Sequence, residues 1–284
     1  MINKIAVIGV GLIGGSLIRA LRKASAVKEV IGYDRNTAQL QSALKQNIID
    51  VAKSAIDVTI ADANIIVIAT PVGAIQQIFE QISPFINKKV TVTDVGSTKV
   101  SVINDCKNVF GELPTWFVPG HPIAGTEKSG VNNSFANLFT NRQVILTPTK
   151  TTDGEKINLV RSMWQLAGAK VSLLKASEHD RILAAASHLP HVLAFALMHY
   201  LKYEPEVFHF SGGGFKDFTR IASSDPKMWH DICLANSKEI ARLIKGYKNS
   251  LSHLEMLIET NDSAHLLESF IEAKLTRDTN LNKQ

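Results

Sequence analysis

The sequence contains little cysteine. Cys106 and Cys233 are the two cysteines among 284 residues. Two cysteines are too few for a disulfide framework, and their separation does not match the spacing of metal ligands. We therefore expect two buried thiols in a reducing compartment, and no bound metal.

The sequence also lacks a block of like charges. Its formal net charge is +5, and no basic stretch is interleaved with aromatic residues. This composition argues against a nucleic-acid partner. A mild positive balance suits a small anionic substrate or cofactor.

No signal-peptide pattern opens the sequence. The N-terminus leads almost directly into a strand pattern, so we expect a cytoplasmic protein. The most apolar run, residues 182–201, includes Pro190 and three histidines, which are His188, His191 and His199. These residues favour a buried helix over a transmembrane one, and we expect no membrane partner.

Apolar strand patterns and helical patterns alternate through the first 174 residues. The expected strands are 4–8, 30–34, 64–71, 90–96, 115–118, 142–148 and 169–174, and the expected helices are 12–21, 37–46, 73–82, 99–110 and 154–167. This alternation predicts an α/β fold for residues 1–174, with a doubly wound, parallel sheet of the Rossmann type.

The pattern becomes helical from residue 175. Helical periods run through 176–201, 226–259 and 262–276, and the polar tail from Thr276 is expected to fray. The glycine-rich stretch at 210–220 predicts a loop with special backbone angles. We therefore expect an all-α second domain over residues 175–284.

A dinucleotide-binding glycine pattern follows the first expected strand. Gly9 permits a tight turn, Gly11 permits close approach of a pyrophosphate, and Gly14 permits close packing of helix on strand. Leu12 and Ile13 begin the helix, whose N-terminus would face the anion. Because the motif lies between a strand and a helix, we expect a nicotinamide dinucleotide here.

A carboxylate ends the second expected strand. Asp34 lies about 20 residues after the glycine motif, where a carboxylate binds the adenosine ribose hydroxyls of NAD. Arg35 beside it could instead pair with the phosphate of NADP, so NADP stays open. Thr70 and Pro71, after another buried strand, are expected near the cofactor or in an ordinary turn.

A histidine follows the strand expected at 115–118. His121 lies in a segment that we expect to be a loop at the carboxyl ends of the strands, where ligands gather. A nicotinamide accepts hydride, and a base near the hydroxyl of the hydride donor would lower the barrier. Histidine suits this role at neutral pH because its unperturbed pKa is about 6–7. Ser97, in "DVGSTK", is either a substrate contact or a helix N-cap, and Thr98 is the alternative cap.

The helical domain supplies a second polar cluster. Ser187 and His191 are four residues apart, on one helical face. Pro190 between them predicts a kink. Arg220 ends the glycine-rich stretch and follows Asp217 by three residues, so it is either a substrate contact or part of a surface ion pair.

These motifs together resemble one family along nearly the whole chain. The chain resembles the prephenate/arogenate dehydrogenases of tyrosine biosynthesis, and the resemblance is carried by "GVGLIGGS", "TPV", "DVGSTK", "GHPIAGTEKSG", "SHLPH" and "GGGFKDFTRIASSDPKMW". The resemblance implies NAD(P)-dependent oxidative decarboxylation of prephenate or arogenate, and a helical domain that pairs two subunits in a homodimer.

The resemblance also implies roles for individual residues. His121 and Ser97 would bond the ring hydroxyl, and Arg220 would bind a substrate carboxylate. Ser187 and His191 would line the substrate pocket, Thr126 and Glu127 would shape the loop, and Glu127 would pair with Arg220 to gate entry. Family members usually carry arginine where Lys216 stands, which puts a bidentate contact from this position in doubt.

Two other functions remain open at this point. A Rossmann-plus-helical dehydrogenase of a hydroxyacid or an imine would share the glycine motif but does not account for "GHPIAGTE". A nonenzymatic NAD-sensing module would bind cofactor without turnover. No residue distinguishes the keto group of prephenate from the amine of arogenate.

Overall fold

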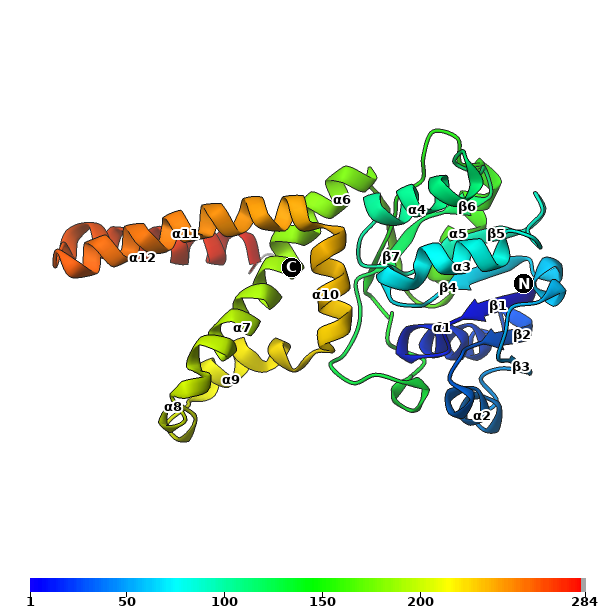
Figure 1. The fold of residues 1–284 in the computed structure, drawn as a ribbon, viewed down its shortest axis with the longest axis horizontal. Coiled ribbons are helices and arrows are strands. Elements are labelled where there is room, and N and C mark those ends of the chain that lie inside the picture. The colour runs from blue at the N-terminus through cyan, green and yellow to red at the C-terminus, as the bar shows by residue number, and fades with distance from the viewer. Residues whose placement is uncertain (282–284) are drawn as a thin grey trace. The chain divides into compact units, whose positions relative to one another are not determined.

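The computed structural model describes residues 1–281 of the chain (Figure 1). It comprises two compact units, one covering Met1–Ser237 and the other beginning at Lys238. The predicted boundary near residue 174 is a different division and stays a prediction.

The first unit is built on a six-stranded parallel sheet with the order β3-β2-β1-β4-β5-β6. Its strands are β1 (Ile2–Ile8), β2 (Val27–Tyr33), β3 (Val51–Lys53), β4 (Ile65–Ile68), β5 (Thr91–Asp94) and β6 (Phe117–Val118). The strand order reverses between β1 and β4, which is where doubly wound sheets bind ligands. The predicted Rossmann-type sheet is confirmed, although the short edge strand β3 was not foreseen.

Helices cover both faces of this sheet. α1 (Leu12–Lys23), α2 (Thr37–Lys45) and α5 (Gly154–Leu166) contribute to one apolar cluster, and α3 (Ile75–Ile82) and α4 (Val100–Phe110) contribute to the other. Alternate residues of the central strands enter the two clusters: Val7 and Val67 enter the first, and Ile8 and Ile68 the second. Burial on both faces explains why these strands are almost continuously apolar.

The chain from 119 to 173 does not extend the parallel sheet as predicted. β7 (Gly120–Pro122), β8 (Gln143–Leu146) and β9 (Lys170–Leu173) form a separate sheet, in which β7 and β8 are antiparallel. His121 therefore lies in a short strand and not in a loop, paired with Ile145. The start of β7 lies close to the end of β5, because a Cβ on Gly120 would lie 3.1 Å from the Asp94 carbonyl oxygen.

The helical part of the first unit begins with an interrupted helix. α6 (Ala176–Leu183) passes through a π-helical turn (Ala184–His188) into α7 (Leu189–Tyr200). Pro190 is the second residue of α7 and has no N–H to donate, and the helical type changes just before it. The predicted kink stays a prediction. Then come α8 (Glu206–His209), α9 (Gly213–Thr219) and α10 (Pro226–Ala235).

Two predictions about the later helices were wrong. The glycines at 212–214 do not form a loop with special angles: Gly212 is extended, with φ −82°, and α9 starts at Gly213. Glycine tolerates helical angles at a modest cost in entropy. The tail from Thr276 does not fray within the described residues, because α12 (Ser263–Leu281) continues through it.

The apolar stretch after residue 175 is mostly not buried. Among the described residues, Ala176–Tyr203 is long and apolar enough to span a membrane by length and composition, which is weak evidence by itself. Only 22% of its most apolar window is buried within this chain, so the prediction of a buried helix was wrong for the single chain. Cys106 is buried as predicted, whereas Cys233 is only partly so.

The second unit consists of two long helices. α11 (Ser237–Glu259) reaches into it from Ser237, and α12 follows after a short turn containing Asn261. Large apolar side chains on both helices are exposed, among them Met256, Ile258, Leu267 and Phe270. So many exposed apolar side chains are typical of a surface that packs against another chain.

Candidate active site

The glycine turn after β1 has the geometry that the motif predicts. Gly9 has φ +96°, and a Cβ there would lie 2.5 Å from the Ala69 carbonyl oxygen. A Cβ on Gly14 would lie 2.4 Å from the Gly9 carbonyl oxygen. A Cβ on Gly11 would meet no atom within 4 Å, so the turn presents an open face beside the start of α1.

The N-terminus of α1 lies at this open face. Gly11 is its N-cap and provides no side-chain hydrogen bond, and Leu12 and Ile13 are its first two residues. The first N–H groups of a helix have no partner within the helix, and the helix dipole makes this end positive. The arrangement suits a pyrophosphate.

Asp34 lies directly beside the glycine turn. Its two carboxylate oxygens accept hydrogen bonds from the backbone N–H groups of Val10 and Asn36, both at 2.9 Å. These bonds fix the carboxylate just beyond β2, where it can still accept hydroxyl donors on its remaining lone pairs. Arg35 is exposed.

The end of β4 contributes the other side of the cofactor site. The buried Thr70 hydroxyl has no hydrogen-bond partner among the described residues. Pro71 starts the short turn of helix Val72–Ala74 that leads into α3. An unpaired buried hydroxyl and an uncapped helix N-terminus are two features that a bound dinucleotide would satisfy, so these residues fit NAD.

A buried ion pair fixes the ends of β5 and β7. The Lys99 ammonium pairs with the Asp94 carboxylate and donates to the Gly120 carbonyl oxygen at 2.7 Å, and neither charged side chain is exposed. Asp94 also accepts the N–H groups of Gly96 at 2.7 Å and Gly120 at 3.1 Å. β7 is thereby held at the carboxyl end of the sheet.

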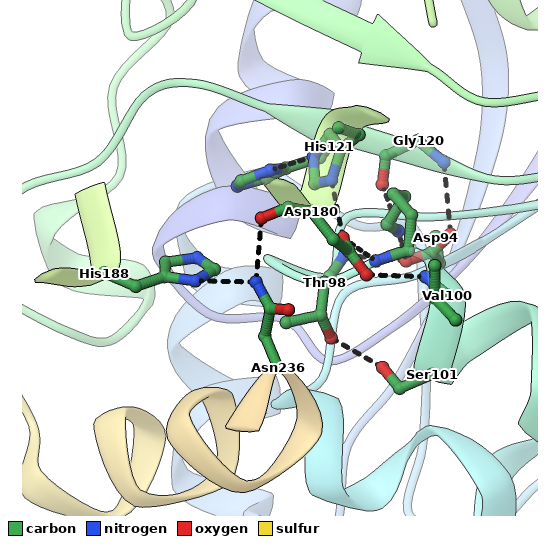
Figure 2. A network of polar contacts seen from close by, with 12 residues as sticks. Asp94, Thr98, Val100, Ser101, Gly120, His121, Asp180, His188 and Asn236 are labelled. Atoms are coloured by element: carbon green, nitrogen blue, oxygen red, sulfur yellow. Dashed lines mark hydrogen bonds and ion pairs between the residues drawn. The ribbon is translucent and has the colours of Figure 1, made fainter. Parts of the chain in front are cut away.

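His121 on β7 begins a chain of polar contacts (Figure 2). Its Nδ1 lies 2.9 Å from Nε2 of His179, and Nδ1 of His179 lies 2.8 Å from the Asp180 carboxylate. Burial, with repulsion from His179 and Lys99, lowers the pKa of His121 well below the ordinary value of about 6.5. His121 is therefore a neutral base at pH 7.

Asp180 caps a helix from a distant part of the sequence. Its carboxylate accepts the N–H groups of Lys99 at 2.7 Å and Val100 at 2.9 Å, at the start of α4. The predicted caps, Ser97 and Thr98, do not cap this helix. Its N-cap residue is Lys99, which makes no capping bond with its side chain, and the Thr98 hydroxyl bonds the Ser101 hydroxyl at 2.6 Å instead. Ser97 is half-buried at the carboxyl end of the sheet, between Asp94 and the start of α4.

A second histidine lies at the start of α7. His191 donates from Nδ1 to the Ser187 backbone carbonyl at 2.9 Å, so the two residues meet as predicted but not through the serine hydroxyl. Its ring stacks on Trp229 of α10, with centroids 3.7 Å apart. Burial lowers the pKa of His191, and the charge of Arg220 adds to this effect.

Arg220 and Glu127 meet as expected. Arg220 Nη1 lies 3.6 Å from a Glu127 carboxylate oxygen, and both side chains are largely exposed. The Thr126 hydroxyl bonds within its own turn, to the Lys128 carbonyl oxygen at 3.2 Å. Beside Arg220 is a cavity of about 370 Å³ lined by Phe195, Met198, Lys216, Thr219, Arg220, Ala222 and Ser223.

The arrangement combines a dinucleotide turn, a neutral histidine and a cationic pocket. Residues 17–173 match the model of the prephenate dehydrogenase nucleotide-binding domain, and residues 175–272 match that of the prephenate dehydrogenase dimerization domain. The chain belongs to the prephenate dehydrogenase family.

Full-length relatives agree with this assignment. A cyclohexadienyl dehydrogenase of Zymomonas mobilis is 35% identical over 96% of this chain and 94% of its own length. A prephenate dehydrogenase of Bacillus subtilis is 35% identical over 98% of this chain and 76% of its own length. The prephenate dehydrogenase of A. aeolicus, crystallised with hydroxyphenyl propionate and NAD⁺, superposes with a TM-score of 0.90 at 39% identity and covers 98% of both chains.

Sequence reasoning missed several residues of this prephenate dehydrogenase family site. Asp94, Lys99, His179, Asp180 and Trp229 are buried and lie within the polar network or against it. A signal was present in "HD" (179–180), two adjacent titratable residues that lie at buried positions of an otherwise amphipathic helix. Buried titratable residues are rare unless they are paired or functional.

Proposed function

We propose that the chain converts prephenate to 4-hydroxyphenylpyruvate and carbon dioxide, with NAD as the cofactor, in tyrosine biosynthesis. Membership of the prephenate dehydrogenase family supports this reaction. The observation that carries the chemistry is the neutral His121, whose Nδ1 is occupied by His179. Bound NAD supplies the hydride acceptor.

His121 acts as the general base. Its free Nε2 accepts the proton of the substrate's ring hydroxyl, and this hydrogen bond strengthens as positive charge builds on the oxygen. Ser97 bonds the same hydroxyl and orients it. The lowered pKa keeps His121 able to accept the proton throughout the neutral range.

Arg220 anchors a substrate carboxylate. Arg220 lines the cavity beside α9, and its one ionic partner among the described residues is the exposed Glu127 at 3.6 Å, an interaction that solvent weakens. A substrate carboxylate can therefore replace Glu127, and the pair acts as a gate. Ser187, His191 and Thr126 shape the rest of the pocket.

The pyrophosphate binds at the N-terminus of α1, where it contacts Gly9, Gly11, Leu12, Ile13 and Gly14. Asp34 binds the adenosine ribose hydroxyls and disfavours a ribose phosphate, so NAD is preferred to NADP. Arg35, Thr70 and Pro71 complete the cofactor site.

The chain works as a cytoplasmic homodimer with two functional domains. Residues 1–174 bind the nucleotide, and residues 175–284 bind substrate and pair the subunits. The exposed apolar side chains of α11 and α12, and the match of 175–272 to a dimerization domain, support this assembly.

Steady-state rates with prephenate and arogenate, each with NAD and with NADP, test the proposal. We expect the highest kcat/KM with prephenate and NAD. A higher kcat/KM with arogenate would show that arogenate, and not prephenate, is the substrate. Turnover of neither, with NAD still bound, would favour a nonenzymatic NAD-sensing module or a different hydroxyacid dehydrogenase.

A further inference from the structure

Two histidines and a carboxylate form a continuous chain that ends at the proposed base. His121 comes from β7, whereas His179 and Asp180 come from α6 (Figure 2). The two contacts are 2.9 Å and 2.8 Å, and His179 is fully buried. The assigned functions of His121 do not by themselves explain why its second nitrogen faces another buried imidazole.

The contacts determine which nitrogens carry protons. Asp180 receives three donors, from the Lys99 N–H, the Val100 N–H and His179, as an ionised carboxylate does. A carboxylate only accepts, so His179 carries a proton on Nδ1. Burial lowers the pKa of His179, so the ring is neutral and keeps a lone pair on Nε2. That lone pair faces Nδ1 of His121, which must therefore donate. The proton of His121 is on Nδ1, and its Nε2 is unprotonated.

We propose that His179 is a positioning residue that holds His121 in the Nδ1–H tautomer and fixes its ring orientation, with Asp180 as the anchor. The inference rests on the proposed role of His121 as the base. It explains the geometry, because an imidazole protonated on Nε2 could not take the hydroxyl proton at that atom. The tautomer of a histidine is set by the hydrogen bond at its other nitrogen.

The anchor is itself held in place from two sides. The N-terminus of α4 holds the Asp180 carboxylate, and the Asn236 side chain donates to the Asp180 backbone carbonyl at 2.9 Å. In the reaction, the O–H bond of the substrate breaks and an N–H bond forms at Nε2 of His121. As carbon dioxide leaves, its bonding electrons pass through the ring to the oxygen, which takes the proton back from Nε2 and gives the phenol of the product. No proton needs to move between His121 and His179, and the transient imidazolium lies one ring away from a carboxylate.

Two substitutions separate positioning from packing. In His179→Gln, the amide oxygen can accept from His121 and the amide NH₂ can donate to Asp180, as the ring does. In His179→Leu, both hydrogen bonds are lost while volume is kept. We expect kcat to fall at least about 100-fold in the leucine variant, within the range for loss of general-base help, with KM for prephenate changed less than about threefold. The glutamine variant should recover at least about tenfold of that loss.

His265→Gln provides a matched control. His265 also bonds a carboxylate through Nδ1, Asp262 at 2.7 Å, but it is exposed and outside the network. The kcat of the His265→Gln variant should equal that of the wild type. Equal losses in the glutamine and leucine variants, or an unchanged kcat in the leucine variant, would overturn the positioning role.

A measurement without substrate keeps this inference separate from the proposed function. Nitrogen-15 NMR of the wild type labelled at histidine distinguishes protonated from unprotonated ring nitrogens, and the His179 and His121 variants assign the signals. We expect Nδ1–H tautomers for both rings, with His121 retaining this tautomer in His179→Gln and losing it in His179→Leu. An Nε2–H tautomer of His121 in the wild type would refute the inference, even if prephenate turns over. Wild-type protein that shows the expected tautomers but does not turn prephenate over would instead refute the proposed function.

Discussion

Replacement of Gly11 by alanine should separate cofactor binding from folding. A Cβ at this position meets no atom within 4 Å, and the φ of −96° is accessible to alanine. The remaining cost is the poorer N-capping of α1 by alanine, which we expect to lower the free energy of unfolding by no more than about 1 kcal/mol.

The same methyl group would project into the space that we assign to the pyrophosphate. Loss of one hydrogen bond to a charged acceptor costs about 1.5–3 kcal/mol. At about 1.4 kcal/mol for each tenfold change, the Kd for NAD should rise about 12- to 150-fold. Titration calorimetry with NAD, together with thermal unfolding of the free protein, measures both quantities.

Gly14→Ala is the matched control. Its Cβ would lie 2.4 Å from the Gly9 carbonyl oxygen, so the backbone must shift and the free energy of unfolding should fall by about 1–3 kcal/mol. A Gly11→Ala protein that binds NAD as tightly as the wild type would show that the glycine turn does not hold the pyrophosphate.

Three further substitutions test the site. His121→Asn should lower kcat about 10²- to 10⁴-fold without changing NAD affinity, as measured by steady-state kinetics and NAD titration. Because burial lowers the pKa of His121, the wild-type rate should be lost only as pH falls well below 6.5, and this acid limb should vanish in the variant; a limb retained in the variant would identify another base. Asp34→Ser should weaken NAD and improve relative use of NADP, and an unchanged ratio of kcat/KM values would reject the ribose contact. Arg220→Gln should raise the Kd for prephenate about ten- to a hundredfold, and an equal rise for NAD would make the residue structural.

The cofactor turn was predictable because its physics is local. Gly9, Gly11 and Gly14 belong to one strand–turn–helix segment, and Asp34 follows at the end of the adjacent strand. The strands β1, β2, β4 and β5 were predictable for a similar reason, since burial on both faces leaves an apolar run in the sequence.

The polar network depends on contacts that local patterns do not encode. Asp180 caps α4 across 80 residues, and His179 reaches His121 across 58. The sequence "DVGSTK" offers two good capping residues, Ser97 and Thr98, so local chemistry pointed to the wrong cap. β7 was missed because its partner β8 lies more than 20 residues further on, beyond a segment rich in turns.

The capping of α4 by Asp180 gives the site a sensitivity to acid. Burial opposes the ionisation of Asp180, but hydrogen bonds from His179 and from the Lys99 and Val100 amides hold its pKa below the ordinary value. Such a carboxylate stabilises the native fold above its unfolded-state pKa, and this stabilisation is lost as pH falls through the lower, folded-state pKa. Protonation would release the start of α4 and the histidine chain together. Structural integrity and the geometry of the histidine chain should therefore be lost in a single titration of this residue.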